Sequence, residues 1–193
     1  LFLYWFFQRG LFDQTIIIPF KSVSSHISAA LYIPLSILVF LSTTNAVNLT
    51  DGLDGLAAGL IIIALLAFAL IAFHQDKKNL AIFALTIVLS CTSFLLFNFH
   101  PARIFLGDVG SLGLGGVLAT IAVFSNAELF LLIIGGIFVL ETLSVITQVL
   151  SIQLNNKPIF LMSPIHHHFE MMKWKEVRIV IMFWTVGLLF ALL

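Results

Sequence analysis

Long apolar runs, broken by short polar segments, dominate the chain. Crossing the hydrocarbon core of a bilayer takes about 20 apolar residues in a helix. Six stretches with few or no charges approach that length: 31–47, 56–73, 80–99, 112–124 with its flanks, 129–154 and 179–193. Lipid leaves no partner for free backbone groups, and the runs lack the alternation of barrel strands. The pattern therefore predicts an all-α, polytopic bundle of about six transmembrane helices, plus the end of one more in the opening LFLYWFF.

Composition and charge narrow the class of protein further. Hydrophobic residues make up 61% of the chain and charged residues 9%, against roughly 25% charged residues in soluble domains. The net charge is zero, so the chain lacks the excess of basic residues that is typical of nucleic-acid-binding proteins. Cys91 is the single cysteine, which excludes a disulfide scaffold. Without repeats or low-complexity linkers, we expect one membrane domain over residues 1–193.

Six crossings would place alternate loops on opposite membrane faces. Segments 48–55, 98–111 and 151–176 share one face, and segments 8–28, 74–79 and 125–128 share the other. The first face collects three aspartates, a lone histidine and a run of three histidines. It also carries five of the nine Lys and Arg residues. By the positive-inside rule this small excess favours the cytoplasmic side for that face.

The first candidate motif is NAVNLTDGLDG, ending at Gly55. Asp51 and Asp54 are three residues apart and share a face if the segment is helical. Gly52 and Gly55 permit a sharp turn or close approach to a ligand. Two carboxylates beside Asn48 would suit a hard divalent cation such as Mg²⁺. Equally open is a local role, with Asp51 as a helix N-cap and Asp54 as a first-turn charge.

The second motif runs from Asn98 to Ser111 and continues into a glycine-rich run. A helix starting between Asp108 and Ser111 would direct its free N–H groups at the loop, which favours a phosphate. Asp108 could then hold a bridging metal, and Phe105 could stack on a flat base. The alternatives are an N-cap for Asp108, ordinary packing for Phe105, and close helix packing for the glycines.

The third motif is SPIHHHFE. Three successive histidines cannot all point at one atom on a regular element, which argues against a zinc site. We expect one or two of them to donate to phosphate while the others support the loop, with a purely structural loop as the alternative. Glu141 lies inside a predicted span, where we favour a buried interhelical hydrogen bond over catalysis. Gln148 lies nearer the polar face and could reach a substrate amide or base.

The segments NAVNLTDGLDGLA, FLGDVGSLGLGG, ETLSVITQV and SPIHHHFE resemble, in order and spacing, the phospho-N-acetylmuramoyl-pentapeptide-transferases. These MraY-type enzymes belong to the polyprenyl-phosphate N-acetylhexosamine-1-phosphate transferase superfamily. The resemblance implies transfer of phospho-N-acetylmuramoyl-pentapeptide from its uridine diphosphate (UDP) carrier to undecaprenyl phosphate, with Mg²⁺, releasing UMP and forming lipid I for peptidoglycan. It also implies a bacterial inner (plasma) membrane, with the active-site loops on the cytoplasmic face.

The same resemblance assigns roles to individual residues. It places Asp108 on the metal with Asp51 and Asn48 close by, so Asp108 and Asp51 are the expected metal ligands. The residues expected around the uridine are Gly52, Leu53, Asp54, Phe105 and Gln148. The residues expected near the phosphates are Asn98, His166, His167 and His168.

One departure from the family pattern concerns an adjacent aspartate pair followed by lysine, which the family carries in an earlier cytoplasmic loop. No Asp-Asp occurs in these 193 residues. We therefore expect the chain to be the C-terminal part of a longer multi-span enzyme, inactive alone. A sister N-acetylglucosamine-1-phosphate transferase is the alternative enzyme. A transporter is the alternative class, although acids gathered in loops favour chemistry on a lipid headgroup. A homodimer stays open.

Overall fold

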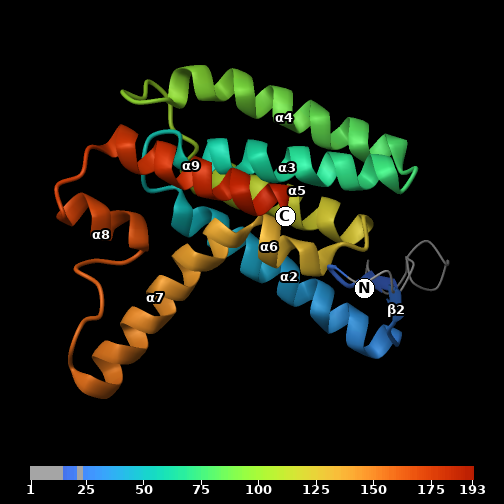
Figure 1. Cartoon of the computed structure of the whole chain (residues 1–193), viewed down its shortest axis with the longest axis horizontal. Helices are drawn as coiled ribbons and strands as arrows, with labels where there is room; N and C mark the ends of the chain where they lie inside the picture. Colours follow the sequence, from blue (N-terminus) through green and yellow to red (C-terminus); the bar gives the residue numbers. More distant parts are fainter. Residues whose placement is uncertain (1–14, 21–23) are drawn as a thin grey trace.

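A computed structural model describes residues 15–20 and 24–193 as a helical bundle (Figure 1). The helix end expected in the opening LFLYWFF lies outside these residues. The long helices are α2 (Ala29–Thr50), α3 (Leu56–His74), α4 (Lys78–Asn98), α5 (Gly107–Phe124), α7 (Gly136–Asn155) and α9 (Glu176–Leu192). All of these except α9, which has 17 residues, are long and apolar enough to cross a membrane. The prediction of an all-α polytopic bundle is confirmed.

A short hairpin precedes the bundle in a segment predicted to be a loop. Strand β1 (Thr15–Ile17) pairs antiparallel with β2 (Ser24–His26), with Thr15 opposite His26. The hairpin is tied to the turn after α5, because Ile17 N–H donates to the Asn126 carbonyl at 3.0 Å and the Asn126 amide donates to the Thr15 carbonyl at 2.9 Å. This turn lies at the end of the bundle that the sequence assigns to the less polar face.

Helix α3 forms the centre of the bundle. In its most apolar stretch 61% of the residues are buried, against 22% to 39% in the other four spans. The helix is apolar on every side, as expected of a helix surrounded by protein. It packs along α4 and α9 and also contacts α5 and α2. Its Leu65 and Phe68 side chains are fully buried.

Small residues bring the helices of the core together. A Cβ on Gly59 of α3 would lie 2.1 Å from the Trp184 ring of α9, so only glycine fits that contact. A Cβ on Gly115 of α5 would lie 2.7 Å from the Thr44 backbone of α2. The expected close packing of the glycine-rich run is therefore present at Gly115, whereas Gly113 faces open space. Such contacts are typical of helix association in membranes.

The single helix predicted over 129–154 is wrong. The structure divides this region into a 3₁₀ turn η1 (Glu128–Phe130), a short helix α6 (Leu131–Ile134) and α7. The break falls at Gly135, which has weak helix propensity, followed by a second glycine. The Phe190 ring packs where a Cβ of Gly136 would lie, at 2.7 Å. Beyond the break, α7 diverges from the bundle axis (Figure 1).

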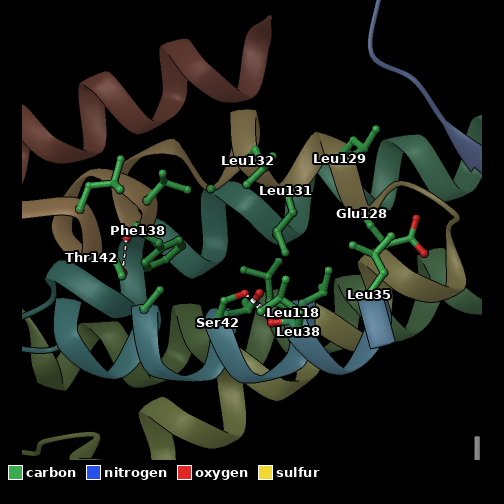
Figure 2. Close-up of a pocket in the computed structure, with 16 residues that line it drawn as sticks. Leu35, Leu38, Ser42, Leu118, Glu128, Leu129, Leu131, Leu132, Phe138 and Thr142 are labelled. Carbon is green, nitrogen blue, oxygen red and sulfur yellow. Dashed lines mark hydrogen bonds between the residues drawn. The ribbon is translucent and has the colours of Figure 1, made fainter. Parts of the chain in front are cut away.

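An apolar cavity of about 310 Å³ lies between α2 and the η1–α6–α7 region (Figure 2). Leucines from both sides line it, and the Glu128 carboxylate at one end accepts a hydrogen bond from the Tyr32 hydroxyl. Its lining follows α2 from Leu35 to Ala46, which lies four residues before the end of the helix at Thr50, or about 6 Å along the helix. The cavity therefore lies between the spans and reaches to about one helical turn from the polar loops.

Candidate functional site

Three polar segments gather at one end of the bundle, at the left of Figure 1. They are the α2–α3 loop (51–55), the α4–α5 loop (99–106) and the α7–α9 connection (156–175), which contains α8 (Ile165–Met171). We call them the loop cluster. Hydrogen bonds and close polar contacts join the first two segments to each other and to Glu176, the first residue of α9. The prediction that these loops share one face is confirmed.

The turn after α2 determines where Asp51 lies. Asp51 directly follows the last residue of α2, and its N–H donates to the Asn48 carbonyl at 3.2 Å. The N-cap of α3 is Gly55, whose φ of +77° is the left-handed conformation that glycine adopts readily. The proposal that Asp51 caps a helix N-terminus is therefore wrong. A carboxylate at the negative end of a helix dipole is unfavourable, which suggests a purpose other than helix stability.

Asp51 and Asp108 form an acidic pair without a neighbouring cation among the described residues. Burial, and secondly the charge of Asp108, raise the pKa of Asp51 from 3.8 to about 6. Asp108 is exposed in the first turn of α5, but the N-cap position belongs to Leu106, so its expected alternative role as an N-cap is also wrong. The Asn48 amide donates to Asp108 Oδ1 at 3.1 Å and to Ser111 Oγ at 2.9 Å.

This pair fits a hard divalent cation. Asp51 is partly withdrawn from solvent and lies close enough to the charge of Asp108 for both effects to raise its pKa. A divalent cation with oxygen preference would relieve both costs. Asp108 and Asp51 are the residues that could hold it, and Asn48 fixes the orientation of Asp108.

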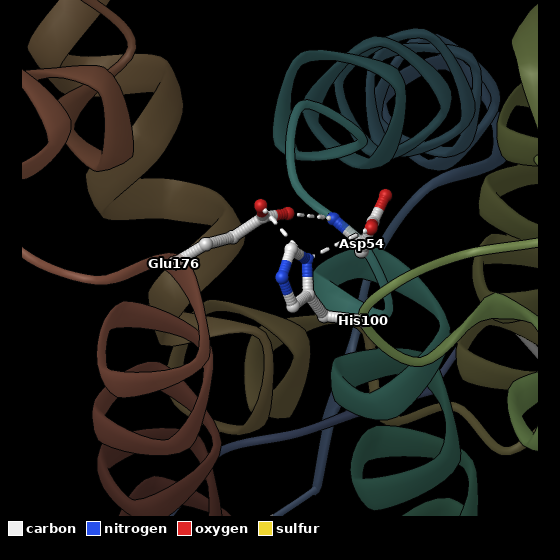
Figure 3. A group of neighbouring side chains, drawn as sticks. All are labelled: Asp54, His100 and Glu176. Atoms are coloured by element: carbon white, nitrogen blue, oxygen red, sulfur yellow. Dashed lines mark hydrogen bonds and ion pairs between the residues drawn. The ribbon is translucent and has the colours of Figure 1, made fainter.

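A second polar group joins the α2–α3 loop, the α4–α5 loop and the start of α9 (Figure 3). His100 Nδ1 lies 3.1 Å from Asp54 Oδ2 and 3.1 Å from Glu176 Oε2. The Asp54 N–H donates to Glu176 Oε1 at 2.7 Å, and the Ala102 N–H donates to Asp54 Oδ2 at 2.9 Å. One ligand atom from each of the three side chains lies within 4.8 Å of the others, a spacing that could hold a metal. The hydrogen bonds already engage these carboxylates. We therefore interpret the group as a structural contact that holds the two loops and the start of α9 together.

Neither Glu176 nor His100 was predicted from the sequence to have a role. Glu176 is 122 residues away from Asp54 along the chain. No local motif could have paired them. The only available signal was that both flank loops predicted to share a membrane face.

The residues expected around a uridine have different environments. Phe105 is 72% exposed on the loop cluster, so the alternative of core packing does not apply. Gly52 is also exposed, whereas Leu53 is buried in the hydrophobic core. The buried Gln148 side chain bonds backbone groups of residues 159 and 160, each at 2.9 Å. Their part in substrate binding stays a prediction.

Asn98, expected near the phosphates, is buried and joins two loops. Its Oδ1 accepts from the Gly55 N–H at 3.1 Å, and its Nδ2 donates to the Ile104 carbonyl at 2.9 Å. In this structure its polar atoms hold the α2–α3 loop against the α4–α5 loop. Contact with phosphate stays a prediction for this residue.

The three successive histidines lie on α8 and face different partners. His166 is fully buried, and its Nδ1 lies 3.1 Å from Glu141 Oε1. His167 Nδ1 pairs with Glu170, while His168 Nδ1 accepts from the Leu161 N–H at 3.1 Å. The three rings do not converge on one atom, as predicted. Glu141, for which a buried interhelical hydrogen bond was favoured, lies beside His166 of α8 without a hydrogen bond.

Known proteins similar to the chain carry one recurring name. Over 193 residues, the whole chain is 49% identical to a phospho-N-acetylmuramoyl-pentapeptide-transferase of Anoxybacillus flavithermus, covering 59% of that protein. The enzyme of the same name from Desulforudis audaxviator is 52% identical over 92% of the chain and 55% of its own length. That from Halalkalibacterium halodurans is 55% identical over 84% of the chain and 50% of its own length.

The chain thus spans little more than half the length of these relatives. A family model, "Glycosyl transferase family 4", matches residues 1–126, more than half of the chain. The matched part contains both aspartates of the acidic pair and all of α2, α3 and α4. The chain is a multi-pass membrane protein that belongs to glycosyl transferase family 4.

Proposed function

We propose that the chain is the C-terminal part of an enzyme that transfers phospho-N-acetylmuramoyl-pentapeptide from its UDP carrier to undecaprenyl phosphate, releasing UMP and forming lipid I. The observation that carries the proposal is the loop cluster, which joins the acidic pair Asp51–Asp108, the exposed ring of Phe105 and the histidine helix α8. The names of relatives about 50% identical to the chain support it. All 193 residues would act as one membrane domain.

Mg²⁺ is the cation we propose at the acidic pair, held by Asp108 and Asp51. When bound, it would neutralise the donor diphosphate and stabilise charge on departing UMP. Asn48 keeps the Asp108 carboxylate turned towards the α2 end through its 3.1 Å hydrogen bond. The positive N-terminus of α5, where Asp108 lies, adds free N–H groups that favour a phosphate.

Donor recognition would come from the same loops. Phe105 offers an aromatic face to the uracil ring, and the Asp54 carboxylate offers a hydrogen-bond acceptor. Asp54 is suited to this because the Ala102 N–H and His100 already fix its orientation. His167 and His168, both only partly buried, are the members of the histidine run that we propose near the phosphates.

The membrane-spanning bundle supports a lipid acceptor and a location in the membrane. Undecaprenyl phosphate would bring its phosphate to the loop cluster at the membrane surface while its chain stays in lipid. We place the loop cluster on the cytoplasmic face of a bacterial inner membrane, where the UDP-linked donor occurs. The excess of basic residues on that side is small, five against four, but has the required sign.

A fusion tests this proposal, because the chain covers only part of its relatives. The chain is joined behind the N-terminal region of the Anoxybacillus flavithermus relative and purified in detergent. UMP release is then measured with UDP-linked muramoyl pentapeptide and with UDP-N-acetylglucosamine, each with and without undecaprenyl phosphate. We expect release only with the muramoyl donor and the acceptor together. Faster release from the glucosamine donor would identify the sister transferase instead.

A further inference from the structure

Glu141 and His166 form a pair of ionisable side chains with no exposure to solvent. Both are 0% exposed, and His166 Nδ1 lies 3.1 Å from Glu141 Oε1. Glu141 belongs to α7, a candidate membrane span, and His166 belongs to α8. Burying an ionisable group is costly unless it has a partner. Within the described part of the chain, neither the carboxylate oxygens of Glu141 nor the ring nitrogens of His166 make a hydrogen bond, so each of the two groups has the other as its polar neighbour at 3.1 Å.

The other edge of the His166 ring meets the α2–α3 loop. A Cβ on Gly52 would lie 2.2 Å from His166 Nε2 and 2.9 Å from its Cε1. The ring is therefore held between Glu141 on one side and the backbone of Gly52, the residue after Asp51, on the other. The His166 ring also packs on the His167 ring, with centroids 4.1 Å apart. Any shift of His166 would move the acidic turn, the histidine helix, or both.

We propose that Glu141 is a positioning residue, which acts through His166 to set the place of α8 against the Asp51–Gly52 turn. A carboxylate beside Nδ1 fixes the proton on that nitrogen and the rotation of the ring. Nε2 then stays directed at Gly52, and the small size of Gly52 allows the approach. The contact between Glu141 and His166 is part of the fold and does not depend on the proposed function. Only its role in catalysis rests on the proposed function.

The neighbouring Thr142 provides a matched control. It lies at the same depth of α7, and its hydroxyl donates to the Phe138 carbonyl of its own helix at 2.9 Å. Thr142→Val removes a polar group of the same span without touching His166. Glu141→Gln keeps the size of the side chain and removes its charge.

The contact is tested in the purified chain, independently of activity. Histidines are labelled with ¹⁵N, and His166→Asn identifies the signal of interest. We expect the His166 Nδ1 signal to shift in Glu141→Gln and to stay unchanged in Thr142→Val, because the Glu141 carboxylate lies 3.1 Å from this nitrogen. Gly52→Ala should shift the same signal, because the added Cβ would meet the opposite edge of the His166 ring while Glu141 stays intact. This variant still tests the contact if Glu141→Gln does not fold. An unchanged His166 signal in Glu141→Gln or in Gly52→Ala would overturn the proposal.

The catalytic consequence is tested in the fusion described above. We expect Glu141→Gln and His166→Asn each to lower kcat at least tenfold with little change in the donor KM. Because Glu141 acts through His166, the double variant should be no slower than the slower single variant. Effects that multiply would overturn the proposal. A fusion that releases no UMP with either donor contradicts the proposed function, whereas the ¹⁵N signal still decides whether Glu141 holds His166.

Discussion

Asp51→Asn should stabilise the chain when no divalent cation is present. The substitution keeps the shape of the side chain and removes the charge that burial and Asp108 disfavour. The pKa of Asp51 rises from 3.8 to about 6 on folding. At about 1.36 kcal/mol per pKa unit, the ionised carboxylate costs at most about 3 kcal/mol of folding free energy. Partial exposure to solvent reduces this to about 1–2 kcal/mol.

The pH dependence of this cost has a definite sign. Since the folded chain binds the proton more tightly than the unfolded chain, the free energy of unfolding falls as pH rises from about 4 to about 6. The loss is complete above about pH 7, where Asp51 is ionised in the folded chain as well. Asp51→Asn should remove this part of the pH dependence, so the variant gains stability over wild type at pH 7.5 and not at pH 4.

Thermal unfolding of the purified chain in detergent with a chelator measures the effect. At about 2–4 °C per kcal/mol for a chain of this size, Asp51→Asn should raise Tm by about 2–8 °C at pH 7.5. Added Mg²⁺ should stabilise wild type and leave the variant unchanged. An Asp51→Asn chain that is less stable than wild type at pH 7.5 without Mg²⁺ would refute the reasoning.

Five further substitutions test the site and the packing. Asp108→Asn in the fusion should abolish UMP release while circular dichroism shows unchanged helix content; normal rates at saturating Mg²⁺ would contradict a metal role. Phe105→Ala and Asp54→Asn should weaken binding of the UDP-linked donor, measured by calorimetry, at least tenfold more than binding of the lipid acceptor; equal losses would argue for loop support alone. Gly59→Ala should lower stability by about 1–3 kcal/mol because its Cβ meets the α9 tryptophan, whereas Gly113→Ala, which faces open space inside α5, should not lower Tm.

The apolar runs predicted most of the bundle because membrane thickness fixes how long a spanning helix must be. The predicted stretch 56–73 and the helix Leu56–His74 agree to one residue. The break at Gly135 escaped prediction because two glycines in an apolar run are also compatible with an unbroken helix. Beside the break, the Phe190 ring of α9 packs on Gly136, a contact between segments far apart in sequence that no local pattern reveals.

The sequence predicted which loops form the candidate site, but not the contacts of the individual side chains. Alternation of the spans brings Asp51 and Asp108 to one face, and the structure places them close enough to alter a pKa. The role of Asp51 as an N-cap was wrong because the left-handed Gly55 places the helix start four residues later. Two contacts could not be inferred from the sequence: that of Asp54 with Glu176 and that of His166 with Glu141. Both join distant segments and depend on how α7 and α9 pack.

The identity of the lipid product tests the central claim most directly. The purified chain and a separately expressed N-terminal region of the Anoxybacillus flavithermus relative are each assayed alone and then together. Each assay contains undecaprenyl phosphate, Mg²⁺ and both UDP-linked donors, and lipid products are analysed by mass spectrometry. We expect undecaprenyl diphosphate carrying N-acetylmuramoyl pentapeptide only when both pieces are present. The same product from the chain alone, or a product carrying N-acetylglucosamine, would contradict the account.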